Sequence, residues 1–211
     1  MTLVGVTKGV PVEVIREAVA LGLADVGENR IQEARAKRSV LEQQPGPAAE
    51  QRPQPVRWHL VGHLQRNKAR LAAALFDVIH SVDSLSLVEE LDRQAAKRVS
   101  RGQSIEVFIQ VNVSGEATKF GCRPEDANEL AQAVADAPRL KLSGLMTMAP
   151  FAEDPERARS HFRRLRQIRD GLAMSSLKLS MGMSQDFEVA VEEGADLVRV
   201  GTAIFGPREP G

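Results

Sequence analysis

The chain opens with the apolar run LVGVTK, residues 3–8, and a helix-like stretch over residues 11–22 follows it almost at once. An apolar run of that length, rich in valine, favours a buried strand. Lys8 then stands at the C-terminal tip of the strand, where a barrel enzyme keeps its reactive groups. A partly desolvated lysine loses its proton more easily than one in water and can form a Schiff base with an aldehyde. The other interpretation of this segment alone is a solvated lysine at a strand end.

Strand and helix patterns alternate along the rest of the chain. Several strand candidates are nearly continuous runs of valine, isoleucine and leucine, as buried parallel strands are. Eight such strands with helices between them predict one α/β domain over residues 1–211, a (β/α)8 TIM barrel, and the main alternative is a doubly wound open sheet. The strand candidates are residues 2–7, 23–27, 57–62, 76–82, 104–112, 140–147, 177–182 and 196–200. The helical patterns are residues 11–22, 29–44, 65–75, 84–100, 124–137, 154–173 and 185–194.

The composition describes a chain with a sizeable core and no overall charge. Apolar residues make up 43% of the 211 residues, and 28 basic side chains balance 28 acidic ones. This balance gives no long-range field toward nucleic acid or anionic lipid, so we expect neither as a partner. The single cysteine, Cys122, excludes an internal disulfide and is typical of a reducing cytosol. No apolar run reaches membrane-spanning length and no secretory pattern opens the chain, so we expect a cytoplasmic protein.

Two loops at strand ends are suited to an anion. In such barrels a phosphate often sits at the loops after strands seven and eight. After the seventh strand candidate comes MGMS, residues 181–184, and Ser184 is expected as the N-cap of a helix that starts near residue 185. After the eighth, Gly201 permits a close approach of the backbone and Thr202 adds a hydroxyl. Both loops would lie opposite Lys8 at the barrel mouth.

Arg199 lies inside the apolar run LVRV, residues 197–200. Because a buried charge without a partner is costly, two interpretations stay open. One is a structural ion pair within the barrel, with Glu28 or Asp186, and the other is a contact with a ligand. At the end of the second strand, Glu28 could hold a cation or orient another side chain, and Asn29 could cap the following helix.

The histidines do not predict a metal site. His59 and His63 have the spacing of two zinc ligands on a helix, but their run is strand-like and lacks the glutamate of the metalloprotease motif. His80, at the end of the fourth strand, could reach the barrel mouth. Cys122 is expected to pack in the loop after the fifth strand. The chain has no tyrosine, so no phenol is available as an acid or base.

Three further patterns concern the outside of the barrel. Six arginines in the helix over residues 154–173 are expected to form a solvated outer face rather than a site for RNA. The proline-rich residues 44–55 are expected to form a flexible loop away from the site. No helix is predicted after the eighth strand or before the first, which would expose apolar barrel surface in the groove between them. We therefore expect the natural chain to carry a further N-terminal helix. The residues of the 154–173 helix expected to face the barrel are His161, Phe162, Leu165, Ile168 and Leu172.

Several sequence blocks, in order at successive strand ends, resemble one family. Together they resemble the pyridoxal phosphate homeostasis protein family of PLP-binding proteins, also called the YggS/PROSC family, over essentially the whole chain. The blocks are VTK (6–8), VGENRIQE (26–33), WHLVG (58–62), LQRNK (64–68), VN (111–112), KFG (119–121), GLM (144–146), LSMGMS (179–184), DFE (186–188) and VRVGTAIFG (198–206).

The resemblance implies a barrel like the N-terminal domain of alanine racemase, a PLP protein of fold type III. It implies that Lys8 holds pyridoxal 5'-phosphate (PLP) as an internal aldimine and that Arg199 lies near the pyridine nitrogen. Ser184, Gly201 and Thr202 would cradle the phosphate. The cofactor-binding residues expected in this way are Lys8, Asn29, Met183, Ser184, Arg199, Gly201 and Thr202, with no catalytic residue and no metal ligand assigned.

The role implied by the resemblance is a PLP carrier and regulator in vitamin B6 and amino-acid homeostasis, without strong turnover. Its partners would be PLP and PLP-dependent apo-enzymes, and we expect a monomer, with a dimer as the alternative. An arginine at the pyridine nitrogen disfavours its protonation and weakens the ring as an electron sink. Racemisation also needs a second base, which in the related racemases is a tyrosine from an added β-domain.

Three alternatives to the carrier remain. The first is a weak PLP-dependent amino-acid racemase. The second is a lysine-dependent aldolase-type barrel, which would carry its lysine on a later strand. The third, a non-catalytic scaffold, is disfavoured by a lysine opposite two loops suited to an anion.

Overall fold

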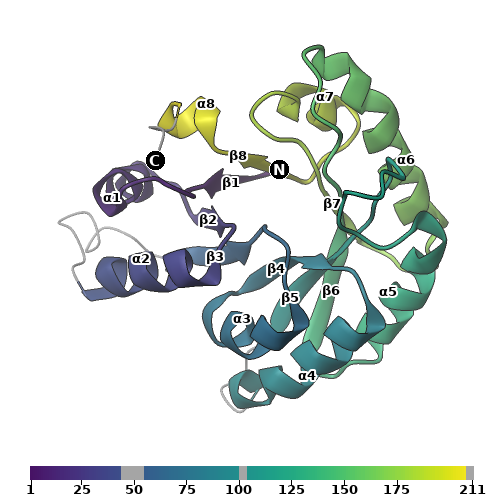
Figure 1. The fold of residues 1–211 in the computed structure, drawn as a ribbon, viewed down its shortest axis with the longest axis horizontal. Helices are drawn as coiled ribbons and strands as arrows, with labels where there is room; N and C mark the ends of the chain where they lie inside the picture. Colours follow the sequence, from purple (N-terminus) through teal and green to yellow (C-terminus); the bar gives the residue numbers. More distant parts are fainter. Residues whose placement is uncertain (44–54, 100–103, 208–211) are drawn as a thin grey trace.

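Eight parallel strands close into a barrel in sequence order in the computed structural model, which describes residues 1–43, 55–99 and 104–207 (Figure 1). The first and last strands pair directly, with Thr2 opposite Leu197 and Gly5 opposite Val200. This pairing confirms the predicted (β/α)8 barrel and excludes the doubly wound open sheet. The strands are β1 (Thr2–Val6), β2 (Asp25–Glu28), β3 (Arg57–Leu60), β4 (Val78–Val82), β5 (Ile105–Gln110), β6 (Leu140–Met146), β7 (Lys178–Ser180) and β8 (Leu197–Val200).

Helices lie around the outside of the barrel and connect the strands (Figure 1). Each of the seven predicted helical patterns contains a helix, and three of these helices begin with a turn of 3-10 helix. The helices are α1 (Val12–Ala20), α2 (Ile31–Gln43), η2 (Arg66–Lys68), α3 (Ala69–Leu75), α4 (Leu85–Val99), η3 (Pro124–Asp126), α5 (Ala127–Ala135), η4 (Pro155–Ala158), α6 (Arg159–Gly171), α7 (Phe187–Glu192) and α8 (Thr202–Phe205). None of the helices in the described ranges is long and apolar enough to cross a membrane.

The expectation that no helix follows the eighth strand is wrong. The single turn α8 comes directly after it, because the carbonyl of Gly201 accepts the N–H groups of Ile204 and Phe205 at 2.9 Å each. A turn of four residues carries too little periodicity to be read from a sequence. The other prediction outside the barrel, a flexible loop over residues 44–55, falls almost wholly outside the described residues.

The core has two parts. Most buried apolar side chains form one large cluster that includes residues of the strands and of the covering helices. A smaller cluster joins side chains from β1, β4, β5, β6 and β8, and strands on opposite sides of a closed barrel meet only in its interior. The members of this smaller cluster are Val4, Val78, Phe108, Met146 and Leu197.

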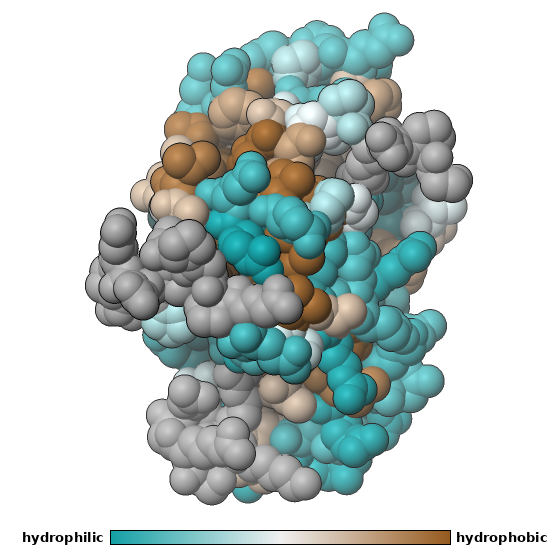
Figure 2. Space-filling view, turned by 90° about the vertical axis from the view of Figure 1, so that its left-hand side faces the viewer, coloured by the Kyte–Doolittle hydropathy of each residue, from teal (hydrophilic) through white to brown (hydrophobic). Residues whose placement is uncertain are grey.

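Apolar side chains remain exposed on the side where α1, α2 and α8 lie. Figure 2 shows this apolar surface with polar residues beside it. Leu21 at the end of α1 is 90% exposed, and Leu3 on β1 is 45% exposed. Leu3 bears out the expected exposure of apolar barrel surface beside the first strand.

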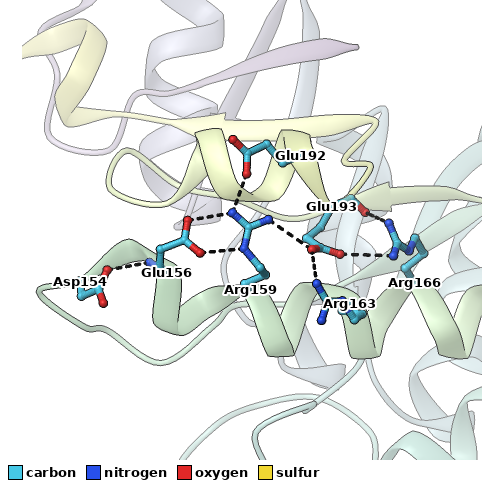
Figure 3. Close-up of polar contacts among 7 residues, drawn as sticks. All are labelled: Asp154, Glu156, Arg159, Arg163, Arg166, Glu192 and Glu193. Carbon is cyan, nitrogen blue, oxygen red and sulfur yellow. Dashed lines mark hydrogen bonds and ion pairs between the residues drawn. The ribbon is translucent and has the colours of Figure 1, made fainter.

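The arginines of α6 have a structural role in addition to being solvated. Glu193, which follows α7 and is 4% exposed, accepts from Arg159 at 3.2 Å and from Arg163 at 2.9 Å, and its other oxygen pairs with Arg166 at 3.3 Å (Figure 3). These contacts fix α7 against α6. The expected outer face is present, since none of the six arginines is buried, but the sequence did not reveal the carboxylate that pairs with three of them.

The inner face of α6 was predicted correctly for its largest side chains. Phe162 and Leu165 are fully buried and Leu172, which follows the helix, is 9% exposed, whereas His161 and Ile168 are half-buried.

We expect the substitution Phe162→Ala to lower the free energy of unfolding by about 3–5 kcal/mol, because it removes a fully buried ring and leaves a cavity. Arg164→Ala on the exposed face of the same helix is the control and should change it by no more than about 0.5 kcal/mol. Urea unfolding measures both values. Equal losses in the two variants would contradict the assignment of the inner face.

Candidate functional site

A cavity of about 570 Å³ opens at the C-terminal ends of the strands. This volume lies within the range of small-molecule sites. Its walls come from the ends of β1, β2, β3, β6, β7 and β8 and from the loops that follow them. All seven residues predicted to hold a cofactor line it, and these are Lys8, Asn29, Met183, Ser184, Arg199, Gly201 and Thr202.

Helix α2 holds the backbone on both sides of Lys8. The N–H of Gly9 donates to Glu33 Oε1 at 2.6 Å, and Lys37 Nζ donates to the carbonyl of Thr7 at 2.6 Å. Lys8 stands between these two anchored residues and lines the cavity. The helix therefore fixes the point from which the Lys8 side chain extends.

A buried carboxylate completes this contact with α2. Glu28 is fully buried and accepts from Lys37 Nζ at 2.8 Å and from the Thr7 hydroxyl at 2.7 Å. Burial outweighs these bonds and raises the pKa of Glu28. Burial also opposes ionisation of Glu33, but bonds from Lys37 and from the N–H of Gly9 lower its pKa overall.

Of the two roles considered for Glu28, holding a cation or orienting another side chain, the structure shows the first, and the cation is Lys37. Sequence reasoning missed Lys37 and Glu33 as supports of Lys8. The signal available was their spacing of four residues on one helix, with Glu33 at the end of the block over residues 26–33.

The loops after β7 and β8 meet at Ser184. Its hydroxyl oxygen accepts the N–H of Gly201 at 3.1 Å and that of Ala203 at 3.4 Å. Two N–H groups thus converge on one oxygen at the edge of the cavity, as in a site for an anion. A Cβ on Gly201 would lie 3.2 Å from the carbonyl oxygen of Val6, so glycine allows this close approach.

Ser184 is not the N-cap of the following helix, contrary to the prediction. Helix α7 begins at Phe187, with Asp186 as the N-cap residue. Asp186 Oδ1 accepts the N–H of Met183 at 2.6 Å, and this turn delays the start of the helix. The turn also needs Gly182, whose φ of +91° is unfavourable for other residues. Ser184 is left to bond the β8–α8 loop instead.

Arg199 forms no ion pair with Glu28 or Asp186, the two partners considered from the sequence. Its Nη1 donates to Ser180 Oγ at 2.7 Å and its Nη2 to the carbonyl of Thr147 at 2.8 Å. Burial lowers the pKa of Arg199 to about 10, against the attraction of Asp186, so the side chain stays cationic at neutral pH. Because Arg199 also lines the cavity, it supplies a buried positive charge there.

Two histidines lie inside the barrel and do not line the cavity. His59 bonds Asp25 at 2.8 Å and His80 at 2.9 Å, and His80 bonds Ser180 at 2.9 Å. His80 is fully buried on β4, so the expectation that it could reach the mouth is wrong. His63 stacks on Phe120 with ring centroids 3.8 Å apart.

Cys122 is buried, as predicted, and its N–H bonds the carbonyl of Gln110 at 2.9 Å. Burial raises the pKa of its thiol to about 12, helped by the nearby acidic residues Asp126 and Asp83. The thiol is therefore protonated at neutral pH and does not act as a nucleophile.

One wall of the cavity was not predicted. Met148, Pro150 and Phe151 come from the loop after β6, and Phe151 is 75% exposed at the rim. The available signal for this wall was that the block over residues 144–146 ends the strand directly before the loop. The sequence does not show whether apolar side chains in a loop point into a cavity or toward solvent.

Known proteins resemble this chain over almost its full length. The family model described as the alanine racemase N-terminal domain matches residues 4–209. The pyridoxal phosphate homeostasis protein of Aquifex aeolicus is 42% identical, over 98% of this chain and 87% of its own length. That of Pseudomonas aeruginosa is 45% identical, over 99% and 85%.

The chain belongs to the pyridoxal phosphate homeostasis protein family. PipY of Synechococcus elongatus, solved with PLP bound, is 37% identical, with a TM-score of 0.83 over 98% of this chain and 92% of PipY. The alanine racemase of Corynebacterium glutamicum is 17% identical, with a TM-score of 0.68, and shares the fold alone; it is matched over 57% of its length. The recognition made from the sequence blocks is therefore confirmed.

We expect Lys37→Met to lower the free energy of unfolding by about 3–5 kcal/mol at pH 7, because it leaves the Glu28 carboxylate buried without its cation. Lys37 lowers the pKa of Glu28, so its removal raises that pKa further and lets the folded variant take up a proton as the pH falls, and this loss should therefore be smaller near pH 5. Urea unfolding at the two pH values measures it. The double variant Lys37→Met with Glu28→Gln should recover part of the stability, and no recovery would contradict the pairing.

Proposed function

We propose that the protein binds PLP as a Schiff base on Lys8 and serves as a PLP carrier and regulator in intracellular vitamin B6 and amino-acid homeostasis, without substantial turnover. The observation that carries this proposal is the meeting of Lys8 with the Ser184–Gly201 contact and Arg199 around one cavity. A lysine amine, converging N–H groups and a buried cation match the aldehyde, the phosphate and the ring of PLP. The relative PipY, solved with PLP bound, supports the same assignment.

Lys8 supplies the attachment. Its amine adds to the aldehyde carbon, the C=O bond is replaced by a C=N bond, and one water is released. The anchored backbone at Thr7 and Gly9 keeps the amine at the cavity. Because this bond forms reversibly, a free amine or another protein can take the cofactor away, as a carrier requires.

The other predicted residues hold the cofactor in place. Ser184, Gly201 and Thr202 would bind the phosphate through hydroxyl and N–H groups, and Arg199 would face the ring as a cation. Asn29 and Met183 would line the remaining wall. The bound ring supplies electron-withdrawing chemistry, which a permanently cationic neighbour weakens by disfavouring protonation of the ring nitrogen.

Strong racemase activity is disfavoured by the groups around the cavity. A racemase needs a second base opposite its lysine, and the chain contains no tyrosine. The two carboxylates among the described cavity residues are engaged with backbone, since Asp154 accepts from the N–H of Glu156 and Asp186 from that of Met183. The curated relatives carry the name of homeostasis proteins rather than enzymes.

We further propose that the whole chain, residues 1–211, acts as one PLP-binding domain, as a monomer in the cytoplasm. Its partners would be PLP and PLP-dependent apo-enzymes.

The attachment residue is tested by adding PLP, reducing with borohydride, and locating the adduct by peptide mass spectrometry. We expect a phosphopyridoxyl group on the peptide that contains Lys8, and its absence in Lys8→Ala. Lys37→Arg is a control that keeps a cation beside Glu28 and should keep the adduct. An adduct unchanged in Lys8→Ala, or spread over surface lysines, would refute the assignment.

The phosphate site is tested by Ser184→Ala combined with Thr202→Val. Each lost hydrogen bond to a charged phosphate should weaken PLP binding by about 1–3 kcal/mol. Titration by absorbance gives the affinity, and Ser86→Ala, at an exposed serine on α4, is the control. Equal PLP affinity in the double variant and the wild-type protein would mean that the phosphate binds in another part of the cavity.

Carrier and racemase are separated by chiral analysis after incubation of the PLP-loaded protein with single L-amino acids. We expect no sustained formation of D-amino acid. D-amino acid that accumulates over many turnovers, and is lost in Lys8→Ala, would overturn the carrier assignment in favour of the racemase.

A further inference from the structure

A chain of polar side chains crosses the interior of the barrel from its N-terminal end to the cavity. Asp25 Oδ1 bonds His59 Nε2 at 2.8 Å, and His59 Nδ1 bonds His80 Nε2 at 2.9 Å. His80 Nδ1 bonds Ser180 Oγ at 2.9 Å, and Ser180 Oγ accepts from Arg199 Nη1 at 2.7 Å. All five residues are buried, with exposures of 9% or less. We call these five residues the relay.

The two ends of the relay lie in different surroundings. Asp25 begins β2, where Arg57 stands 3.8 Å from its carboxylate and bonds Glu106 at 3.1 Å. Arg199 lies near the end of β8 and lines the cavity. Between them His80 stacks on Phe108, with ring centroids 4.7 Å apart, beside the apolar cluster of the barrel interior. The relay therefore links an ionic group at one end of the barrel to the cation of the site at the other.

One arrangement of hydrogens satisfies every member of the relay. Arginine can only donate, so Ser180 Oγ accepts from Arg199 and its own hydrogen is available to His80 Nδ1. His80 then donates from Nε2 to His59 Nδ1, and His59 donates from Nε2 to the carboxylate of Asp25. Each inner group donates once and accepts once.

The opposite arrangement is unfavourable. It would leave the Ser180 hydrogen without an acceptor among the described contacts and would set a bare nitrogen of His59 against a carboxylate oxygen, unless a further proton entered the barrel. Burial opposes such a proton, because it lowers the pKa of His59 and lowers that of His80 well below its usual value. Both histidines are therefore neutral, with the hydrogen on Nε2.

The relay and the carbonyl of Thr147 together hold the guanidinium of Arg199. Nη1 is held by Ser180 and Nη2 by Thr147, so the plane of the group is fixed while Arg199 still lines the cavity. Hydrogen bonds that run in one direction polarise one another. The charge of Asp25 consequently strengthens Ser180 as an acceptor, through two rings.

We propose that Asp25, His59, His80 and Ser180 are positioning residues that hold Arg199 in one orientation toward the cavity and couple it to the charge of Asp25. The ligand that Arg199 meets, PLP, rests on the function proposed above. The relay itself belongs to the ligand-free protein, so the two ideas can fail separately.

The first measurement is nitrogen-15 NMR of the histidine and arginine side chains in the ligand-free protein. We expect His59 and His80 to be neutral Nε2–H tautomers that do not titrate between about pH 5 and pH 8, where an ordinary histidine changes charge. A hydrogen on Nδ1 of either ring, or titration of either ring in this range, would overturn the proposal. This measurement needs no variant and no PLP.

The second measurement compares two substitutions at the same end of the barrel. Asp25→Asn removes the charge and keeps an oxygen that can accept from His59. Glu106→Gln, the matched control, removes a charge beside Arg57 without touching the relay. We expect Asp25→Asn to move the Arg199 Nη1–H resonance upfield, as a weaker hydrogen bond does, and Glu106→Gln to leave it in place. Equal shifts in both variants, or none in either, would overturn the coupling.

The third measurement uses the PLP-loaded protein at matched occupancy. The absorption band of bound PLP should shift in Asp25→Asn and not in Glu106→Gln. If the Asp25 carboxylate had only a structural role, the band would shift in neither variant.

If Asp25→Asn does not fold, Ser180→Ala interrupts the relay at its other end and Ser180→Thr restores the hydroxyl. We expect the band to shift with alanine and to return with threonine, and an unshifted band with alanine would contradict the proposal. If the wild-type protein does not bind PLP, the proposed function is refuted. The two NMR tests, which need no PLP, then still decide whether the relay positions Arg199.

Discussion

The pairing of β1 with β8 is the constraint on which the site depends. Four residue pairs, from Thr2 with Leu197 to Gly5 with Val200, join the two ends of the chain in parallel. They bring Lys8, just past β1, to the same cavity as Gly201 and Thr202, which lie nearly two hundred residues away in the sequence. Because the barrel is closed, each of these two strands is also held by a second neighbour, β1 by β2 and β8 by β7.

Contacts from outside the barrel also fix the position of Lys8. Helix α2 reaches over the end of β1 and binds the backbone before and after Lys8 through Lys37 and Glu33. The same lysine neutralises Glu28, which is fully buried. The residues that line the cavity lie at the strand ends, and the residues that hold Lys8 in place lie on the next helix. In barrels of this kind the site lies at the C-terminal ends of the strands, and the loops there can vary while the strands stay the same.

Much of the fold could be predicted because it depends on local patterns. Apolar runs gave the eight strands, helical spacing gave the inner face at Phe162 and Leu165, and strand ends gave the residues around the cavity. The contacts between distant segments were not predictable in this way. The sequence could not reveal that Ser184 bonds the β8–α8 loop, that Arg199 bonds Ser180 instead of a carboxylate, or that Glu193 receives three arginines. Each depends on side-chain directions that only the closed barrel sets.

The burial of Cys122 has a consequence for handling a reactive aldehyde. Thiolates add to aldehydes and are oxidised by peroxide, whereas protonated thiols do neither at an appreciable rate. With its pKa raised to about 12, the single thiol of the chain competes with no lysine for an aldehyde and offers no entry for oxidants. Under oxidative stress this chain therefore offers peroxide no thiolate to oxidise.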